Sequence, residues 1–232
     1  MGIKILFADI DPNTMNIDVN HVNQLINKNV KAIICVHYGG LPCDMDELQS
    51  IADEWSIPII EDAAHAVGAK YKGSAIGSIS DFTMFSFQAI KHITTGDGGM
   101  LIVKNKELID KAERVRWFGI DRKAKQAGIW ENDITEIGYK YQMTDIAAAM
   151  GIASLQEFDA VSSLRKRLFK VYSDELAGYD RVKIIGNDFD DREHAAWLFT
   201  IIVDNRYKLQ EKLRDNKIES NQVHFRNDRY SI

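Results

Sequence analysis

The sequence has little cysteine and no long hydrophobic run, and both absences narrow the class of protein. Its two cysteines, Cys35 and Cys43, form neither a disulfide framework nor a Cys-x-x-Cys metal pair. The longest strictly apolar stretch, residues 146–153, has eight residues, well short of the ~20 that span a bilayer. The N-terminal run meets an acid too soon for a signal peptide. We therefore expect a cytoplasmic protein with no membrane partner and no metal site.

A basic stripe is also absent, as are internal repeats, low-complexity tracts and Pro/Gly linkers. The 29 Lys and Arg are outnumbered by 34 Asp and Glu, and the net charge is −5. This balance gives no electrostatic reason to expect a nucleic-acid partner. With 45% hydrophobic and 27% charged residues, the chain can bury a core. Its 232 residues correspond to one large domain or one and a half ordinary ones, at roughly 150 residues per domain.

Short apolar runs alternate with amphipathic segments through the first half of the chain. The amphipathic segments predict helices after Asp18, after Asp44 with Glu47 as its capping-box partner, and from about residue 106. This alternation favours a mainly parallel sheet covered on both faces. An antiparallel α+β fold is less favoured, because helix-length segments separate the early runs. The predicted strands are 3–8, 31–36, 58–61, 81–87 and 99–103.

The pattern changes after residue 144. The apolar spacing predicts one long helix from Thr144 to about residue 168. It is followed by a predicted strand at 196–203, a helix at 207–215 and a less regular strand at 218–225. These segments indicate the start of a second, smaller α+β domain.

Polar side chains stand where three of the predicted strands end. Ligand crevices in open parallel sheets lie at the carboxyl ends of the strands, so these residues are candidates for a site. Each one alone is weak evidence, since acids often cap turns and loop lysines are usually solvated. The candidates are His37 after the second strand, Asp62 and His65 after the third, Ser86 near the end of the fourth, and Lys91 and His92 after it, before the turn-forming residues 94–99.

Taken together, three motifs resemble the DegT/DnrJ/EryC1/StrS family of pyridoxal-phosphate sugar aminotransferases. They are Ile-Glu-Asp62-Ala-Ala-His65-Ala-Val-Gly-Ala, Phe-Ser86-Phe-x-x-x-Lys91 and Thr-Thr-Gly-Asp-Gly-Gly99. The resemblance covers roughly residues 5–225. It implies an aspartate-aminotransferase-like large domain of fold type I over residues 1–152, incomplete at its N-terminus. A linking helix and part of a small α+β domain would follow over residues 153–232.

The resemblance implies roles for the candidates. Lys91 stands at the position that forms a Schiff base with the cofactor pyridoxal 5′-phosphate and then moves a proton. Asp62 is the carboxylate that keeps the cofactor ring nitrogen protonated. His65 would contact the ring or its phenolic oxygen, and Ser86 the phosphate. His37 and His92 are candidates for the substrate side, although His92 could instead cap its loop.

The chain departs from the family pattern in two ways. Lys140 stands where relatives commonly have the Asn that reaches the phosphate of the neighbouring subunit, and Gln142 where they have Arg. A lysine could still pair with the phosphate as a point charge. Second, a preceding phosphate-binding Gly-Thr turn, a stacking aromatic and part of the small domain are not in the sequence. We therefore expect the middle of an aminotransferase, in a homodimer.

The leading hypothesis is transfer of an amino group, from L-glutamate, to a keto group on a nucleotide-linked deoxysugar. Dehydratases on the same scaffold replace the lysine with histidine, so Lys91 favours transamination. The alternative is an incomplete, non-catalytic fragment or assembly partner of a full-length homologue. A nicotinamide-binding domain is excluded because no Gly-x-Gly-x-x-Gly follows the first predicted strand.

Overall fold

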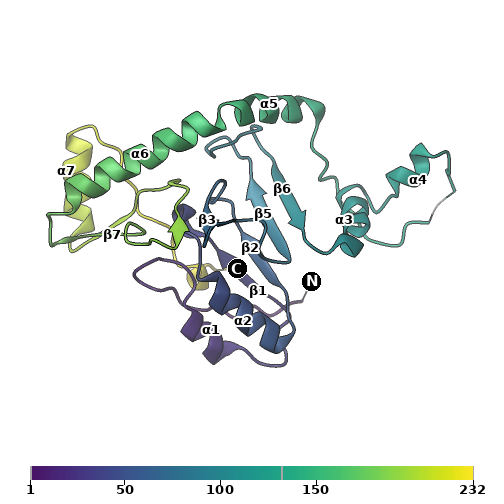
Figure 1. Ribbon diagram of the computed structural model, residues 1–232, viewed down its shortest axis with the longest axis horizontal. Coiled ribbons are helices and arrows are strands. Elements are labelled where there is room, and N and C mark those ends of the chain that lie inside the picture. Colours follow the sequence, from purple (N-terminus) through teal and green to yellow (C-terminus); the bar gives the residue numbers. More distant parts are fainter. Residues whose placement is uncertain (1, 132, 232) are drawn as a thin grey trace.

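The central element is a four-stranded sheet, seen in a computed structural model that describes residues 2–131 and 133–231 (Figure 1). Its strands are β1 (Ile33–Val36), β2 (Ile59–Asp62), β5 (Phe82–Ser86) and β6 (Gly99–Val103), in the order β1-β2-β5-β6. The first three are parallel and β6 is antiparallel to β5. This arrangement confirms the predicted α/β class with a mainly parallel sheet.

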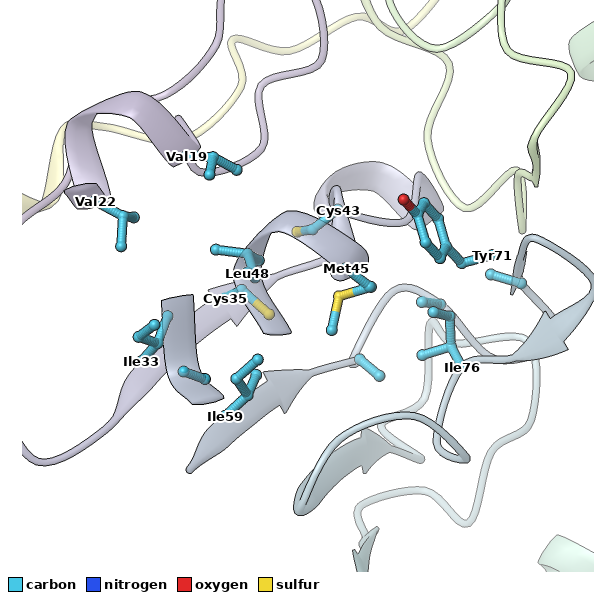
Figure 2. Close-up of a cluster of buried hydrophobic side chains, with 14 of the residues drawn as sticks. Val19, Val22, Ile33, Cys35, Cys43, Met45, Leu48, Ile59, Tyr71 and Ile76 are labelled. Carbon is cyan, nitrogen blue, oxygen red and sulfur yellow. The ribbon is translucent and has the colours of Figure 1, made fainter. Parts of the chain in front are cut away.

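Two helices cover one face of this sheet and form the main core with it (Figure 2). They are α1 (Val19–Leu25) and α2 (Met45–Trp55). Leu48 of α2 and Ile59 of β2 are fully buried at the centre of this cluster. The opposite face of β1 is open, since Ile34 and Val36, which alternate with buried residues of β1, are 59% and 43% exposed.

The two predicted helix caps differ in outcome. The Asp18 side chain accepts a hydrogen bond from the Asn20 backbone N–H, which confirms it as the cap of α1. Asp44 occupies the N-cap position of α2, but its side chain makes no capping bond. Its carboxylate accepts instead from Arg192 Nη2 at 2.7 Å, and a charge-assisted bond to a buried guanidinium outcompetes a neutral amide.

The helices of the second half of the chain are less enclosed. They are α3 (Ile109–Arg116), α4 (Arg122–Gln126), α5 (Asp145–Gln156), α6 (Phe158–Leu176) and α7 (Arg206–Asp215). The predicted single long helix is broken at Glu157 into α5 and α6, although it begins at the predicted cap, Thr144.

A two-stranded sheet of β7 (Val182–Ile184) and β9 (Ile201–Val203) accompanies α6 and α7. A small sheet joins β3 (Lys70–Tyr71) to β4 (Ser74–Ala75) and β8 (Arg192–Glu193), and short 3₁₀ turns occupy Tyr38–Gly40, Lys106–Leu108 and Asn227–Arg229.

Three predicted strands are wrong wholly or in part. Residues 3–8 form no strand, since nothing described pairs with them, and Ile3 remains 75% exposed. Residues 218–225 form none either. The strand expected over 196–203 is confined to β9, because Ala196 takes a left-handed backbone conformation with φ of 55°. A strand needs a hydrogen-bonded neighbour as well as an apolar sequence.

The molecule exposes an unusually large surface. A folded monomer of 26.4 kDa exposes about 10,600 Å², whereas this chain exposes 15898 Å². Within the described residues, no helix is both long and apolar enough to cross a membrane. The division into domains at residue 152, which falls inside α5, stays a prediction.

Candidate active site at the carboxyl ends of the parallel strands

The site is built on the edge of the sheet where β1, β2 and β5 end. Val36 pairs with Asp62 across β1 and β2, and Asp62 pairs with Met84 of β5. His37 therefore leaves β1 beside Asp62, and its backbone N–H donates to the Asp62 carbonyl at 3.1 Å. Because the three strands are parallel, the segments that follow them begin at the same edge.

The loop that carries Lys91 is closed by backbone hydrogen bonds. The Phe87 N–H donates to the Gly98 carbonyl, and the Thr95 N–H donates to the Phe87 carbonyl. The Thr94 N–H donates to Ser154 Oγ, which fastens the loop to α5. The turn predicted over residues 94–99 is thus present. Only glycine fits at position 98, because a Cβ there would lie 2.2 Å from Thr95 Oγ1.

Lys91 is half-buried, against an aromatic ring and within electrostatic reach of a carboxylate. Its Nζ lies 3.9 Å from the centre of the Trp197 ring. Burial lowers the pKa of the Lys91 amine, and the nearby Asp62 carboxylate opposes this shift. The Asp62 side chain accepts from the Ala64 N–H at 3.0 Å, so its carboxylate is held at the strand end.

His65 stacks against the same ring. The His65 and Trp197 rings lie 3.7 Å apart with 12° between their planes, and the ring of His224 lies 6.2 Å from His65. Burial, reinforced by the positive charge of Lys91, lowers the pKa of His65 to about 3. Its buried Nδ1 has no hydrogen-bond partner among the described residues. His65 is therefore a neutral ring with one buried nitrogen that has no partner among the described residues.

His37 has a different environment from the one expected. Its side chain is completely buried. Its Nδ1 accepts from the Cys43 N–H, so Nε2 carries the proton that it donates to Glu61 at 2.7 Å. This burial leaves the side chain no exposed surface, because the buried Glu61 carboxylate needs a partner and His37 supplies it. The expected substrate-side role of His37 stays a prediction.

His92 also faces inward. It is 5% exposed, and its Nε2 bonds the Ala195 carbonyl at 2.8 Å. Burial lowers the pKa of His92, so the neutral ring donates to that carbonyl. His92 therefore neither faces open solvent nor caps its own loop. It joins the Lys91 loop to the segment that carries Trp197.

Ser86 and Lys140 stand apart from the Lys91 cluster in their contacts. Ser86 ends β5, and its Oγ accepts from the Gln88 N–H at 3.3 Å. Lys140 Nζ lies 3.7 Å from the centre of the Trp117 ring, at the end of α3. Figure 1 shows α3 on the side of the sheet opposite α6 and α7. The structure thus brings together Asp62, His65 and Lys91 but does not bring Lys140 to them, and the phosphate role of Ser86 stays a prediction.

Sequence reasoning missed Trp197, His224 and Glu61. Trp197 lay within a run interpreted as a strand, and no residue type in that run predicts the left-handed backbone conformation of Ala196. His224 lay within the strand expected at 218–225. Glu61 did carry a signal, because a carboxylate in a buried strand requires a partner, and His37 follows the neighbouring strand.

The parallel strand ends, with a half-buried lysine beside a carboxylate, define an α/β protein with an aminotransferase-like site. The sequence model of the DegT/DnrJ/EryC1/StrS aminotransferase family matches residues 1–230. The chain belongs to this family. The family assignment confirms the resemblance drawn from the motifs.

Individual relatives agree with this assignment. GDP-perosamine synthase of Escherichia coli O157:H7 is 34% identical over 97% of this chain and 60% of that protein. The crystal structure of the sugar aminotransferase CalS13 from Micromonospora echinospora has a TM-score of 0.94 at 32% identity, covering 99% of this chain and 63% of that one. Spr1654 from Streptococcus pneumoniae, solved in a PLP form, has a TM-score of 0.83 at 30% identity over 95% and 61% of the two chains. The chain spans about 60% of the length of the relatives it matches.

The residues on this edge fit pyridoxal phosphate. Lys91 offers an amine whose pKa burial lowers, and a carboxylate lies within its electrostatic reach. His65 offers a buried nitrogen without a described partner. Among the described residues, no group of three or more His, Cys, Asp and Glu side chains is placed to hold a metal ion.

Proposed function

We propose that this chain forms the cofactor-binding part of a pyridoxal-phosphate-dependent aminotransferase. The amino group would pass from L-glutamate to a keto group of a nucleotide-linked deoxysugar. The observation that carries the proposal is the half-buried Lys91 amine beside Asp62 and the unpartnered His65. The family, the perosamine synthase and the PLP form of Spr1654 support the reaction class and the cofactor.

Each side chain would contribute through a property seen in the structure. Pyridoxal phosphate, when bound, supplies an aldehyde and an electron-accepting ring. Lys91 Nζ would hold the aldehyde carbon and, once released, accept and return a proton, which its lowered pKa favours. The Asp62 carboxylate would keep the ring nitrogen protonated. His65 Nδ1 would meet a polar atom of the ligand, and Ser86 Oγ a phosphate oxygen.

A half-reaction tests this proposal. The chain loaded with pyridoxal phosphate and given L-glutamate should form pyridoxamine phosphate and 2-oxoglutarate, followed by absorbance and chromatography. Lys91→Ala should abolish this conversion, because no other amine occupies that position. Lys170→Ala, at an exposed ion pair on α6, is the matched control and should react as the parent does. A Lys91→Ala chain that forms pyridoxamine phosphate at the parent rate contradicts the proposal.

We also propose that the protein works as a homodimer. Helix α5 has apolar residues around its whole circumference, and Ile146 and Ile152 are 78% and 62% exposed. A second copy would cover such a surface. Light scattering should give twice the mass of 26.4 kDa, and Ile146→Glu should shift the parent protein toward the monomer. A parent protein that is monomeric at every concentration contradicts the dimer.

A binding role is the second candidate. The chain would then be a non-catalytic assembly partner of a longer homologue, and its large apolar surface favours this reading. Purified chain that stays colourless with pyridoxal phosphate, but forms a stable complex with a full-length relative, would select this role. A yellow chain that reacts with glutamate would exclude it.

We also propose that the protein works in the cytoplasm. Both cysteines are buried free thiols, as is usual in a reducing compartment. Cell fractionation tests this location, and recovery in an exported fraction would contradict it.

A further inference from the structure

We propose that Trp197 is a positioning residue that holds the protonated Lys91 side chain against the face of its indole ring. This inference deepens the proposed function and rests on it, because it concerns the amine that would carry the proton. Lys91 Nζ lies 3.9 Å from the centre of the Trp197 ring. At this distance the electron-rich face of an indole attracts an ammonium, whereas a neutral amine gains little.

The segment that carries Trp197 is fastened to three successive residues of the Lys91 loop. The indole N–H of Trp197 donates to the Ile90 carbonyl at 3.4 Å. His92 Nε2 donates to the Ala195 carbonyl at 2.8 Å. Lys91 stands between these two residues of the loop and contacts the ring itself. The Lys91 side chain therefore meets a ring whose position relative to its own backbone is already set.

Other contacts hold Trp197 from the sheet and from α6. Its backbone N–H donates to the carbonyl of Gly39, which follows β1, at 3.1 Å. The His65 ring, which follows β2, stacks on the indole at 3.7 Å with 12° between the planes. Arg165 of α6 donates to the Trp197 carbonyl at 3.4 Å. Two strand ends, the Lys91 loop and α6 thus fix one ring, which gives the lysine a surface of constant position.

The ring favours the charged form of Lys91 and so works against burial. Burial lowers the pKa of the Lys91 amine, and the Asp62 carboxylate opposes this shift. A ring face that attracts the ammonium acts in the same direction as Asp62. His65 and His92 are neutral at pH 7, because burial lowers the pKa of His65 to about 3 and lowers that of His92 as well. The charged and titratable groups around the contact are Asp62 on β2, His65 after it, His92 in the loop, His224 beside His65, and Arg165 on α6.

A fixed position for the ammonium suits the proposed proton transfer. Lys91 Nζ would accept a proton and return it, and a proton carrier is most effective when it is held in a defined place. The indole N–H of Trp197 is already bound to the Ile90 carbonyl, and the ring has no lone pair to offer. Trp197 therefore acts through Lys91 and not on the substrate.

Titration of the Lys91 amine in the chain without pyridoxal phosphate tests this contact. Acetic anhydride in trace amounts labels amines in their neutral form. Peptide mass spectrometry then gives the labelled fraction of Lys91 from about pH 7 to about pH 11, around the ordinary pKa of lysine. Trp197→Leu keeps an apolar side chain beside Lys91 but removes the ring, and we expect the midpoint to fall by about 0.5–1 pH unit. Trp197→Phe, which keeps a ring with a weaker face, should show a smaller fall.

Trp117→Leu is the matched control, because Trp117 contacts a different lysine, Lys140, whose Nζ lies 3.7 Å from its ring centre. This variant should leave the Lys91 midpoint unchanged. Circular dichroism shows which variants fold, and the Trp197→Phe result decides alone if Trp197→Leu does not. An unchanged or raised Lys91 midpoint in the folded Trp197 variants, or an equal fall in Trp117→Leu, would overturn the proposal.

The chain loaded with pyridoxal phosphate gives a second readout. Trp197→Leu should slow the conversion with L-glutamate severalfold while borohydride still attaches the cofactor to Lys91, and Trp197→Phe should recover part of the rate. Parent-like rates in both variants would contradict the positioning role. A Lys91 midpoint that depends on Trp197, in a chain that never converts glutamate, would leave the contact standing and remove the aminotransferase reaction. A reactive chain whose Lys91 midpoint ignores Trp197 would remove this inference alone.

Discussion

The helices in the two halves of the chain differ in how they contribute to the core. In the first half, α1 and α2 contribute buried residues to the core, including Val19, Val22 and Leu48. In the second half, no described residue of α3, α4, α5, α6 or α7 is buried. The difference shows that a helix pattern does not by itself create a core; a second surface must lie against it.

The largest effect should come from breaking the buried hydrogen bonds to Glu61 in the first half. Glu61 accepts hydrogen bonds from His37 Nε2, the Thr83 hydroxyl and the Ser80 N–H. Glu61→Ala leaves His37, the Thr83 hydroxyl and the Ser80 N–H buried without their acceptor. At about 1–3 kcal/mol for each unpaired group, we expect a loss of about 3–5 kcal/mol in the free energy of unfolding. Urea denaturation measures it. Glu193→Ala, at an exposed ion pair, should cost about 1 kcal/mol or less. Equal losses in the two variants would contradict the difference expected between a buried and an exposed carboxylate.

Truncation of leucines compares the two halves directly. Leu48→Ala removes a fully buried side chain and should cost about 2–5 kcal/mol. Leu155→Ala removes a side chain of α5 that is 58% exposed, so under conditions where the chain is monomeric it should change stability by about 0.5 kcal/mol or less. Urea midpoints give both values. A large loss in monomeric Leu155→Ala would mean that α5 is covered within the single chain.

Acid should weaken the folded chain in a defined window. Burial lowers the pKa of His194 from 6.5 to about 4. Between these two pH values the unfolded chain therefore binds a proton that the folded chain does not bind. Stability should therefore fall as the pH drops from about 6.5 to about 4. His65, whose pKa is lowered to about 3, acts in the same direction. His194→Gln should reduce the slope of stability against pH by up to one proton, and an unchanged slope would contradict the assignment.

The smallest effect should come from an exposed pair in the second half. Lys170 and Asp174 lie one turn apart on α6, with Nζ–O distances of 2.9 and 3.0 Å, and both are mostly exposed. Lys170→Ala should lower the free energy of unfolding by about 0.5 kcal/mol or less, and this loss should disappear in 1 M salt. Thermal unfolding at two salt concentrations checks this, and a loss above 1 kcal/mol would show that α6 is anchored there.

The sequence predicts the sheet well because its strands are short apolar runs that alternate with amphipathic helices whose starts are marked by capping residues. It predicts Asp62, His65 and Lys91 as neighbours because parallel strands end at one edge. It fails at residues 3–8, where strand formation depends on a neighbour that the described chain does not supply. It also fails at Trp197, whose position depends on the left-handed backbone of Ala196 and on bonds from Trp197 and Leu198 to the Gly39 carbonyl. Long-range contacts of this kind leave no local pattern.

The central claim is that Lys91 is the amine that meets the cofactor aldehyde. Borohydride reduction of the chain with pyridoxal phosphate, followed by peptide mass spectrometry, tests it most directly. We predict one reduced cofactor per chain, attached to Lys91, and a sharp loss of label in Lys91→Ala. Label spread over exposed lysines such as Lys123 and Lys170, with no preference for Lys91, would contradict it.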